Sequence, residues 1–392
     1  MTPGTNRFVV LDALRGICAL LVCLFHFRNN AAILDSAFIE NCWQFVDFFF
    51  VLSGFVIAAN YRQRIADGMS GWRFLGLRLG RIYPLHVVVL LLFVAAELAA
   101  SAAVVSGATS RPSWDAVHDP AAIITHLLLL QGFWIHDTLT WNAPAWSIGT
   151  EFWAYVMIFG IVALTRHRAE AWLVAVVVVS PLILLVATPY GINVTYNWGM
   201  IRCAYGFALG ALCWAVWRHV GPRALSMTRW TAIEIFAVIA VCVFATVAGP
   251  TRWNVAGPPL FAVALLVFAH EGSAVSRVLS LRLPLFLGTL SYSIYMLHAF
   301  IQARAVNVLT LVERRFGIEL TGFGDPAETS VVTVGTSMAG SAAWTGAIML
   351  LTIGTSYLTY RMIELPGQRW SRARFAQRAS HGVEASVTEP QR

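Results

Sequence analysis

Long runs of apolar residues, separated by short polar segments that contain arginine, cover most of the chain. A transmembrane helix needs about 20 mostly apolar residues to cross a hydrocarbon core of roughly 30 Å. The pattern therefore predicts an all-α, polytopic integral membrane helical bundle. Its ten expected spans lie near residues 8–27, 39–59, 82–104, 144–164, 171–188, 198–217, 230–249, 256–270, 284–305 and 340–360.

Composition supports this class and excludes several chemistries. The 392 residues are 58% hydrophobic and 12% charged, and the mean hydropathy is +0.68, which excludes a soluble domain. All 27 basic residues are arginine, so a lysine nucleophile or a lysine-bound pyridoxal is excluded. The six cysteines show no ligand-like spacing, and we expect neither a metal site nor a tightly bound cofactor. The net charge of +7 lies in short loops between spans, so it does not indicate a nucleic-acid partner.

The apolar segment 121–135 can be read in two ways, and the arginines distinguish them. If it does not cross the membrane, 19 arginines fall on the inner side and five on the outer side. Arginine accumulates on the cytoplasmic side, so we expect a re-entrant or interfacial segment here, with both termini cytoplasmic. Residues 1–366 are then the membrane domain, and 367–392 form a basic, disordered cytoplasmic tail.

The first span carries two ionisable residues that can serve a reaction. Arg15 and His26 are eleven residues apart, so they share a helix face and are separated by roughly 16 Å along the axis. An ionisable side chain in a bilayer is costly and usually serves a pathway or a reaction. We expect His26 to be catalytic, although a histidine here can also be a hydrogen-bonded packing residue.

Two carboxylates are expected at the same outer depth as His26. Asp47 opens the segment VDFFFVLSGFVI, where a substrate contact and a helix cap are competing interpretations. Glu151 lies in WNAPAWSIGTEFWAY, on one face with Ser147 and Tyr155 at i, i+4 and i+8. A structural ion-pair network is the alternative to a catalytic cluster.

Two further motifs carry polar residues. The segment RFLGLRLGRIYP, read as a loop, places Arg78 and Arg81 at i and i+3 before Pro84, which would open the third span. Binding of an anionic cytoplasmic ligand and membrane anchoring both explain this pair, and from these residues alone membrane anchoring is favoured. In GTLSYSIYMLH, Ser291, Tyr295 and His298 recur at i, i+4 and i+7 and form a polar stripe that lines either a cavity or a helix–helix seam.

Taken together, these segments resemble the acyltransferase-3 family of integral membrane acyltransferases. The matching motifs occur in family order: R-x10-H of Arg15 and His26 after LD, DFFFVLSGF, R-x2-R of Arg78 and Arg81, WSIGTE, SYSIYMLH, and E-x-P of Glu364 and Pro366. The resemblance covers nearly the whole chain.

The resemblance implies transfer of an acyl group, usually acetyl, from cytoplasmic acyl-coenzyme A to a hydroxyl, commonly of a cell-surface polysaccharide or glycolipid. It makes the R-x10-H and R-x2-R pairs the functional centres. On this interpretation Arg78 and Arg81 hold coenzyme A phosphates, and the pantetheine arm enters past Arg15. His26 takes the acceptor's proton, and Glu151 orients the imidazole.

The remaining candidates for substrate contacts are Asp47, Trp146, Ser147, Tyr295 and His298. Direct transfer and an acyl-enzyme intermediate are both open. The expected partners are acyl-coenzyme A, a hydroxyl-bearing glycan or lipid-linked acceptor, and the lipid bilayer of the inner or plasma membrane. Some relatives carry a fused esterase-like domain that this chain lacks, so participation of a separate extracytoplasmic protein is left open.

Three alternatives remain. The acceptor can be a small or macrolide-like molecule. The same buried charges can serve a transporter or flippase of a glycan or lipid intermediate. A glycosyltransferase is disfavoured, because no loop carries an acidic cluster resembling a divalent-metal site.

Overall fold

A computed structural model of the chain describes residues 7–27, 36–105, 114–223, 225–323 and 332–376. Its α-helices are Val9–Phe25 (α1), Ala37–Glu40 (α2), Phe45–Ala66 (α3), Gly71–Val105 (α4), Ala121–Leu127 (α5), Ala145–Thr165 (α6), Ala169–Ala187 (α7), Gly199–Val220 (α8), Met227–Ala248 (α9), Gly257–Phe268 (α10), Ala274–Leu279 (α11), Arg282–Phe316 (α12), Met338–Thr359 (α13) and Leu365–Ala376 (α14).

Short elements connect these helices. The 3-10 helices are Cys42–Gln44, Ala116–His118, Arg166–Arg168 and Arg252–Ala256, and Tyr360–Glu364 is a π-helical turn. Thr321–Phe323 (β1) and Val332–Val334 (β2) form a two-stranded antiparallel sheet in which Gly322 pairs with Thr333.

The helices confirm the membrane-type, all-α class. Each expected span overlaps a helix: α1, α3, α4, α6, α7, α8, α9, α10, α12 or α13. Within the described ranges, seven helical stretches are long and apolar enough to cross a membrane. The count of ten and the side of the termini remain predictions.

The segment 121–135 contains only α5, a helix of 7 residues, which is followed by turns. At about 1.5 Å per residue, this helix is roughly 10 Å long, far short of a bilayer core. Its length is that of a re-entrant or interfacial piece.

The expected loop before the third span is instead helical. The 35-residue helix α4 begins at Gly71, so Arg78, Arg81 and Pro84 all lie inside this helix. Proline frees the carbonyl of residue i−4, here Gly80. Gly367 packs directly against Gly80 and Pro84, and this contact covers the weakened turn.

Residues 367–376, expected to belong to the disordered tail, are helical. They lie in α14, which packs antiparallel to α4: Ser371 faces Gly80, and Phe375 faces Gly76. The π-helical turn before Pro366 shifts the hydrogen-bond register, so the chain passes the proline without ending the helix. Residues 377–392 lie outside the described part of the chain.

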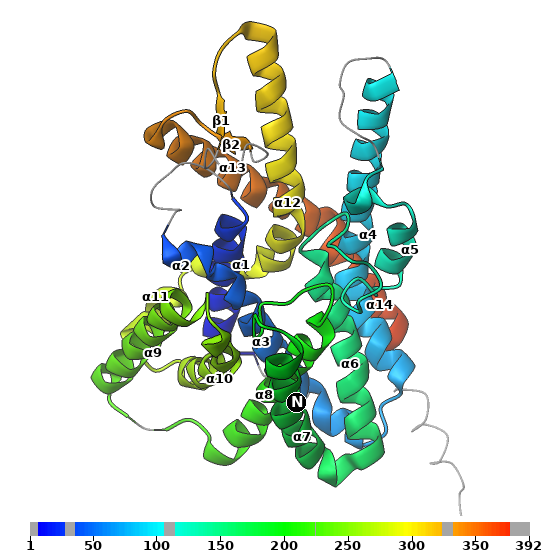
Figure 1. The fold of residues 1–392 in the computed structure, drawn as a ribbon. Coiled ribbons are helices and arrows are strands. Elements are labelled where there is room, and N and C mark those ends of the chain that lie inside the picture. Colours follow the sequence, from blue (N-terminus) through cyan, green and yellow to red (C-terminus); the bar gives the residue numbers. More distant parts are fainter. Residues whose placement is uncertain (1–6, 28–35, 106–113, 224, 324–331, 377–392) are drawn as a thin grey trace, which may run out of the picture.

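The central helices pack in parallel pairs. In Figure 1, α1 lies beside α12, with α9 and α11 on one side of the bundle and α4, α6 and α14 on the other. Helices α3 and α8 approach so closely that a Cβ on Gly54 would lie 2.0 Å from the carbonyl oxygen of Phe207. This packing brings polar faces of five helices around one cavity.

Candidate functional site

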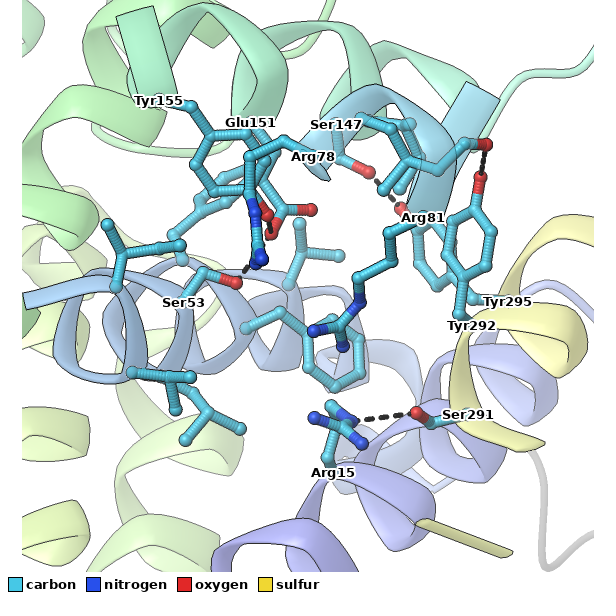
Figure 2. A pocket seen from close by; sticks show the side chains of 18 residues that line it. Arg15, Ser53, Arg78, Arg81, Ser147, Glu151, Tyr155, Ser291, Tyr292 and Tyr295 are labelled. Atoms are coloured by element: carbon cyan, nitrogen blue, oxygen red, sulfur yellow. Dashed lines mark hydrogen bonds between the residues drawn. The ribbon is translucent and has the colours of Figure 1, made fainter. Parts of the chain in front are cut away.

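A cavity of about 90 Å³ lies among α1, α3, α4, α6 and α12. Figure 2 shows the guanidinium groups of Arg15, Arg78 and Arg81 pointing into it. Glu151 is the only carboxylate in its described lining. The hydroxyl-bearing lining residues are Ser53, Ser147, Tyr155, Ser291, Tyr292 and Tyr295. The lining is therefore positively charged and rich in hydrogen-bond donors, as suits an anionic ligand.

Arg15 is held in place by contacts with α12 and with Asp12 on its own helix, α1. Its Nε donates to Ser291 Oγ at 2.9 Å, and a terminal nitrogen donates to the carbonyl oxygen of Gly288 at 3.1 Å. Asp12, one turn earlier on α1, lies 3.3 Å from the same guanidinium. These contacts fix the side chain at the α1–α12 junction.

The two arginines of α4 differ in their contacts. Arg78 donates to the hydroxyl of Tyr61 at 2.6 Å and stacks over its ring, 4.7 Å from the centroid. Arg81, half-buried, makes no hydrogen bond or ion pair with any described residue. The buried carboxylate of Glu364 lies within electrostatic range of Arg81 and Arg15 but accepts hydrogen bonds from Ser293 and Gln368 instead. Arg81 therefore offers donors to a ligand.

Glu151 occupies a different position from the one expected. Its Oε1 accepts hydrogen bonds from Ser53 Oγ at 2.6 Å and from the hydroxyl of Tyr155 at 2.5 Å. Neither hydrogen bond is made with His26, the residue that Glu151 was expected to orient. Glu151 therefore lies beside Ser53, which is six residues beyond Asp47 on α3, and not beside Asp47 itself.

Asp47 is part of a buried ion pair outside the cavity. Its carboxylate accepts two hydrogen bonds from the guanidinium of Arg202, with Nε–Oδ1 and Nη2–Oδ2 distances of 2.9 and 2.7 Å. The guanidinium also stacks on Trp43 and Trp146 at 4.9 and 5.2 Å. Neither Asp47 nor Trp146 lines the cavity, so the structure favours the ion-pair interpretation of Asp47.

The polar stripe of α12 connects the cavity to a second polar site. Tyr295 shares a hydrogen bond of 2.7 Å with Ser147 at the cavity wall, and its ring contacts that of His298. His298 Nε2 lies 3.3 Å from His26 Nδ1. Neither histidine lines the cavity. The polar stripe thus connects the cavity lined by Arg15, Arg78 and Arg81 to the neighbouring His26 and His298.

Comparison with known sequences identifies the family. The acyltransferase domain family matches residues 8–361. The chain belongs to the acyltransferase-3 family. It is 32% identical over 194 residues to "Protein 2 in picA locus" of Rhizobium radiobacter, across 46% of this chain and 95% of that protein. It is 28% identical over 172 residues to "Acyltransferase MdmB" of Streptomyces mycarofaciens, across 40% of this chain and 39% of that protein. No solved structure matches the chain.

Family membership identifies the protein as a membrane acyltransferase, and residues from five of the motifs on which the resemblance rests line the cavity. They are Arg15, Ser53 of DFFFVLSGF, the R-x2-R pair of α4, Glu151 of WSIGTE and Tyr295 of the α12 stripe. The residues that sequence reasoning did not single out are Tyr292, Glu364 as a neighbour of the arginines, and Arg202. Arg202 had one available signal, because a charge inside the eighth helix requires a partner and Asp47 was a carboxylate without one.

Proposed function

We propose that this acyltransferase is an O-acyltransferase of the inner or plasma membrane. It moves an acyl group, taken here as acetyl, from cytoplasmic acyl-coenzyme A to a hydroxyl of a cell-surface polysaccharide or glycolipid. The observation that carries the proposal is the convergence of Arg15, Arg78 and Arg81 in one cavity with a single carboxylate in the lining.

The arginines that line the cavity can bind the phosphates of the acyl donor, acyl-coenzyme A. Coenzyme A carries phosphates, and guanidinium forks bind phosphate oxygens through paired, charge-assisted hydrogen bonds. Arg81 has no partner among the described residues, so binding a phosphate would not break an existing ion pair. Arg78 and Arg81 would hold the phosphates, with the pantetheine arm running past Arg15 toward the histidines.

A histidine is available to act as a base at the thioester end of the pantetheine arm. His26 is eleven residues beyond Arg15 on α1, roughly 16 Å along the helix. In the proposed reaction, His26 removes the proton of the acceptor hydroxyl as its oxygen attacks the thioester carbonyl. A C–O bond forms and the C–S bond breaks. The proton then passes from His26 to the departing thiolate, giving an ester and free coenzyme A.

The experiment measures acyl transfer directly. Purified protein in lipid nanodiscs is supplied with radiolabelled acetyl-coenzyme A and a glycan, lipid or small-molecule fraction from the host. The wild type should transfer label to one of these fractions and release coenzyme A. His26→Gln should lose about 10²–10⁴-fold in turnover while keeping donor binding.

Two results would overturn the proposal. A wild type that consumes no acetyl-coenzyme A but moves a glycan or lipid intermediate across the bilayer would be a transporter. Substantial transfer by His26→Gln would remove His26 as the base. Comparison of glycan and lipid acyl content between a deletion strain and its complement identifies the acceptor.

A further inference from the structure

Glu364 is buried in the π-helical turn that joins α13 to α14. The buried residues of α13 recur at helical spacing up to Ser356. Eight residues later, Glu364 would lie roughly 80° away from that face on a regular α-helix of about 100° per residue. A π-helical turn contains more residues per turn, so it reduces this offset and directs Glu364 into the protein. Single π-helical turns are frequent at functional sites.

The carboxylate of Glu364 lies close to the segment of α12 that holds Arg15. It accepts hydrogen bonds from Ser293 of α12 and from Gln368 of α14, each at 3.0 Å. Ser291, two residues before Ser293, accepts the hydrogen bond from the guanidinium of Arg15. The same segment of α12 therefore contacts both charged groups.

Glu364 also lies close to the segment of α4 that carries Arg81. Gly367, at the start of α14, packs against Gly80, the residue before Arg81. The hydroxyl of Tyr292 donates to the carbonyl oxygen of Ile82, the residue after Arg81. The negative charge of Glu364 acts on both guanidinium groups across these contacts.

Glu364 acts from behind the cavity wall, because it is not among the described residues that line the cavity. Its two hydrogen bonds and the two neighbouring guanidinium groups favour its charged form. A buried negative charge repels any anion that approaches the same arginines. Glu364 therefore opposes the binding of a phosphate-bearing ligand without touching it.

We propose that Glu364 is a positioning residue of the donor site: its charge balances Arg15 and Arg81 and limits the affinity for coenzyme A, so that the product can leave. This inference rests on the proposed function, in which the arginines bind the phosphates of the donor. Acyl-coenzyme A and coenzyme A carry the same phosphates, so stronger phosphate binding would retain both. Binding that is equally strong before and after the reaction does not raise turnover, and product release limits many enzymes.

The test uses Glu364→Gln in lipid nanodiscs, which removes the charge and keeps a hydrogen-bond acceptor of similar shape. Acetyl-coenzyme A should bind about 10-fold more tightly than to the wild type, because a buried repulsion is removed. In the radiolabel assay, inhibition by added coenzyme A should strengthen by the same factor. Pantetheine has the same arm but no phosphate, so its inhibition constant should stay that of the wild type.

Gln368→Leu is the matched control, since it removes one hydrogen bond to Glu364 but no charge. It should lower the melting temperature without tightening the binding of coenzyme A. Glu364→Asp keeps the charge and should bind coenzyme A nearly as the wild type does. Where Glu364→Gln does not fold, Glu364→Met removes the same charge with an apolar side chain of similar length.

Unchanged or weaker binding of coenzyme A by folded Glu364→Gln, beside normal binding by the wild type, would overturn this inference alone and make Glu364 a structural residue. Equal tightening for coenzyme A and pantetheine would also overturn it, because the effect would not act through the phosphates. A wild type that binds no acetyl-coenzyme A would overturn the proposed function with it.

Discussion

Gly16 on α1 and Gly288 on α12 are in direct backbone contact. A Cβ on Gly16 would lie 2.4 Å from the amide nitrogen of Gly288, and a Cβ on Gly288 would lie 2.1 Å from the carbonyl oxygen of Asp12. From this contact the two helices run in the same direction. Arg15 consequently meets Ser291, and His26 meets His298. The close contact between Gly16 and Gly288 therefore positions both Arg15 and His26, the two residues of α1 that the proposed function assigns to the pantetheine arm and to the reaction.

Gly288→Ala should separate α1 from α12, because the added methyl has no space at a backbone contact. Overpacking of this kind typically costs about 1–3 kcal/mol. We expect a lower melting temperature in detergent and a loss of acyl transfer. Gly346→Ala on α13 is the control, since a Cβ there meets nothing within 4 Å. Equal behaviour of the two variants would contradict the role of the glycine contact.

Arg78→Ala and Arg81→Ala should each weaken coenzyme A binding by about 10-fold or more, since a hydrogen bond to a charged group is worth roughly 1.5–3 kcal/mol. Lysine at either position should restore binding only in part, because a fork becomes a point charge. Equilibrium binding of labelled acetyl-coenzyme A measures the effect. Arg372→Ala, an exposed arginine of α14, is the control. Unchanged affinity for acetyl-coenzyme A in both alanine variants would favour the interpretation that Arg78 and Arg81 anchor the protein at the membrane surface.

Glu151 and His26 should act independently, because Glu151 contacts Ser53 and Tyr155 rather than the imidazole. Glu151→Gln should lower turnover about tenfold by weakening two charge-assisted hydrogen bonds. The variant carrying both Glu151→Gln and His26→Gln should show the product of the two single losses. A double variant no slower than His26→Gln alone would indicate direct coupling of the two residues.

Asp47→Ala should destabilise the protein by roughly 3–5 kcal/mol, because it leaves Arg202 buried and unpaired. Replacing both partners, as Asp47→Leu with Arg202→Met, should restore much of the folded yield. Thermal unfolding and size-exclusion chromatography in detergent measure this. A folded Asp47→Ala protein that no longer binds donor or acceptor would instead support the substrate contact expected from the sequence.

Reporter fusions test the membrane topology. A reporter after His136 should lie outside and one after Arg168 inside, because α5 is too short to cross the bilayer. A reporter after Asp67, in the turn between α3 and α4, serves as the inside control. Finding the Arg168 fusion outside would invert every later helix.

Hydropathy and helical period were enough to predict the membrane class, the position of the helices and the shared face of Ser147, Glu151 and Tyr155. These properties depend on neighbours within a few turns. The same local signals were misleading at Pro84 and Pro366. Pro84 was expected to open the third span and a disordered tail was expected after Pro366, whereas packing of α14 on α4 and a π-helical turn carry the helices through both positions.

The pairing of charged and polar residues was decided by the tertiary structure. Asp47 pairs with Arg202, 155 positions away, and His26 with His298, 272 positions away. A sequence pattern shows that a buried charge needs a partner but not which of several helices supplies it. That choice depends on where helices approach closely enough for small residues to touch, as at Gly16 and Gly288, and such contacts form only when the whole bundle packs.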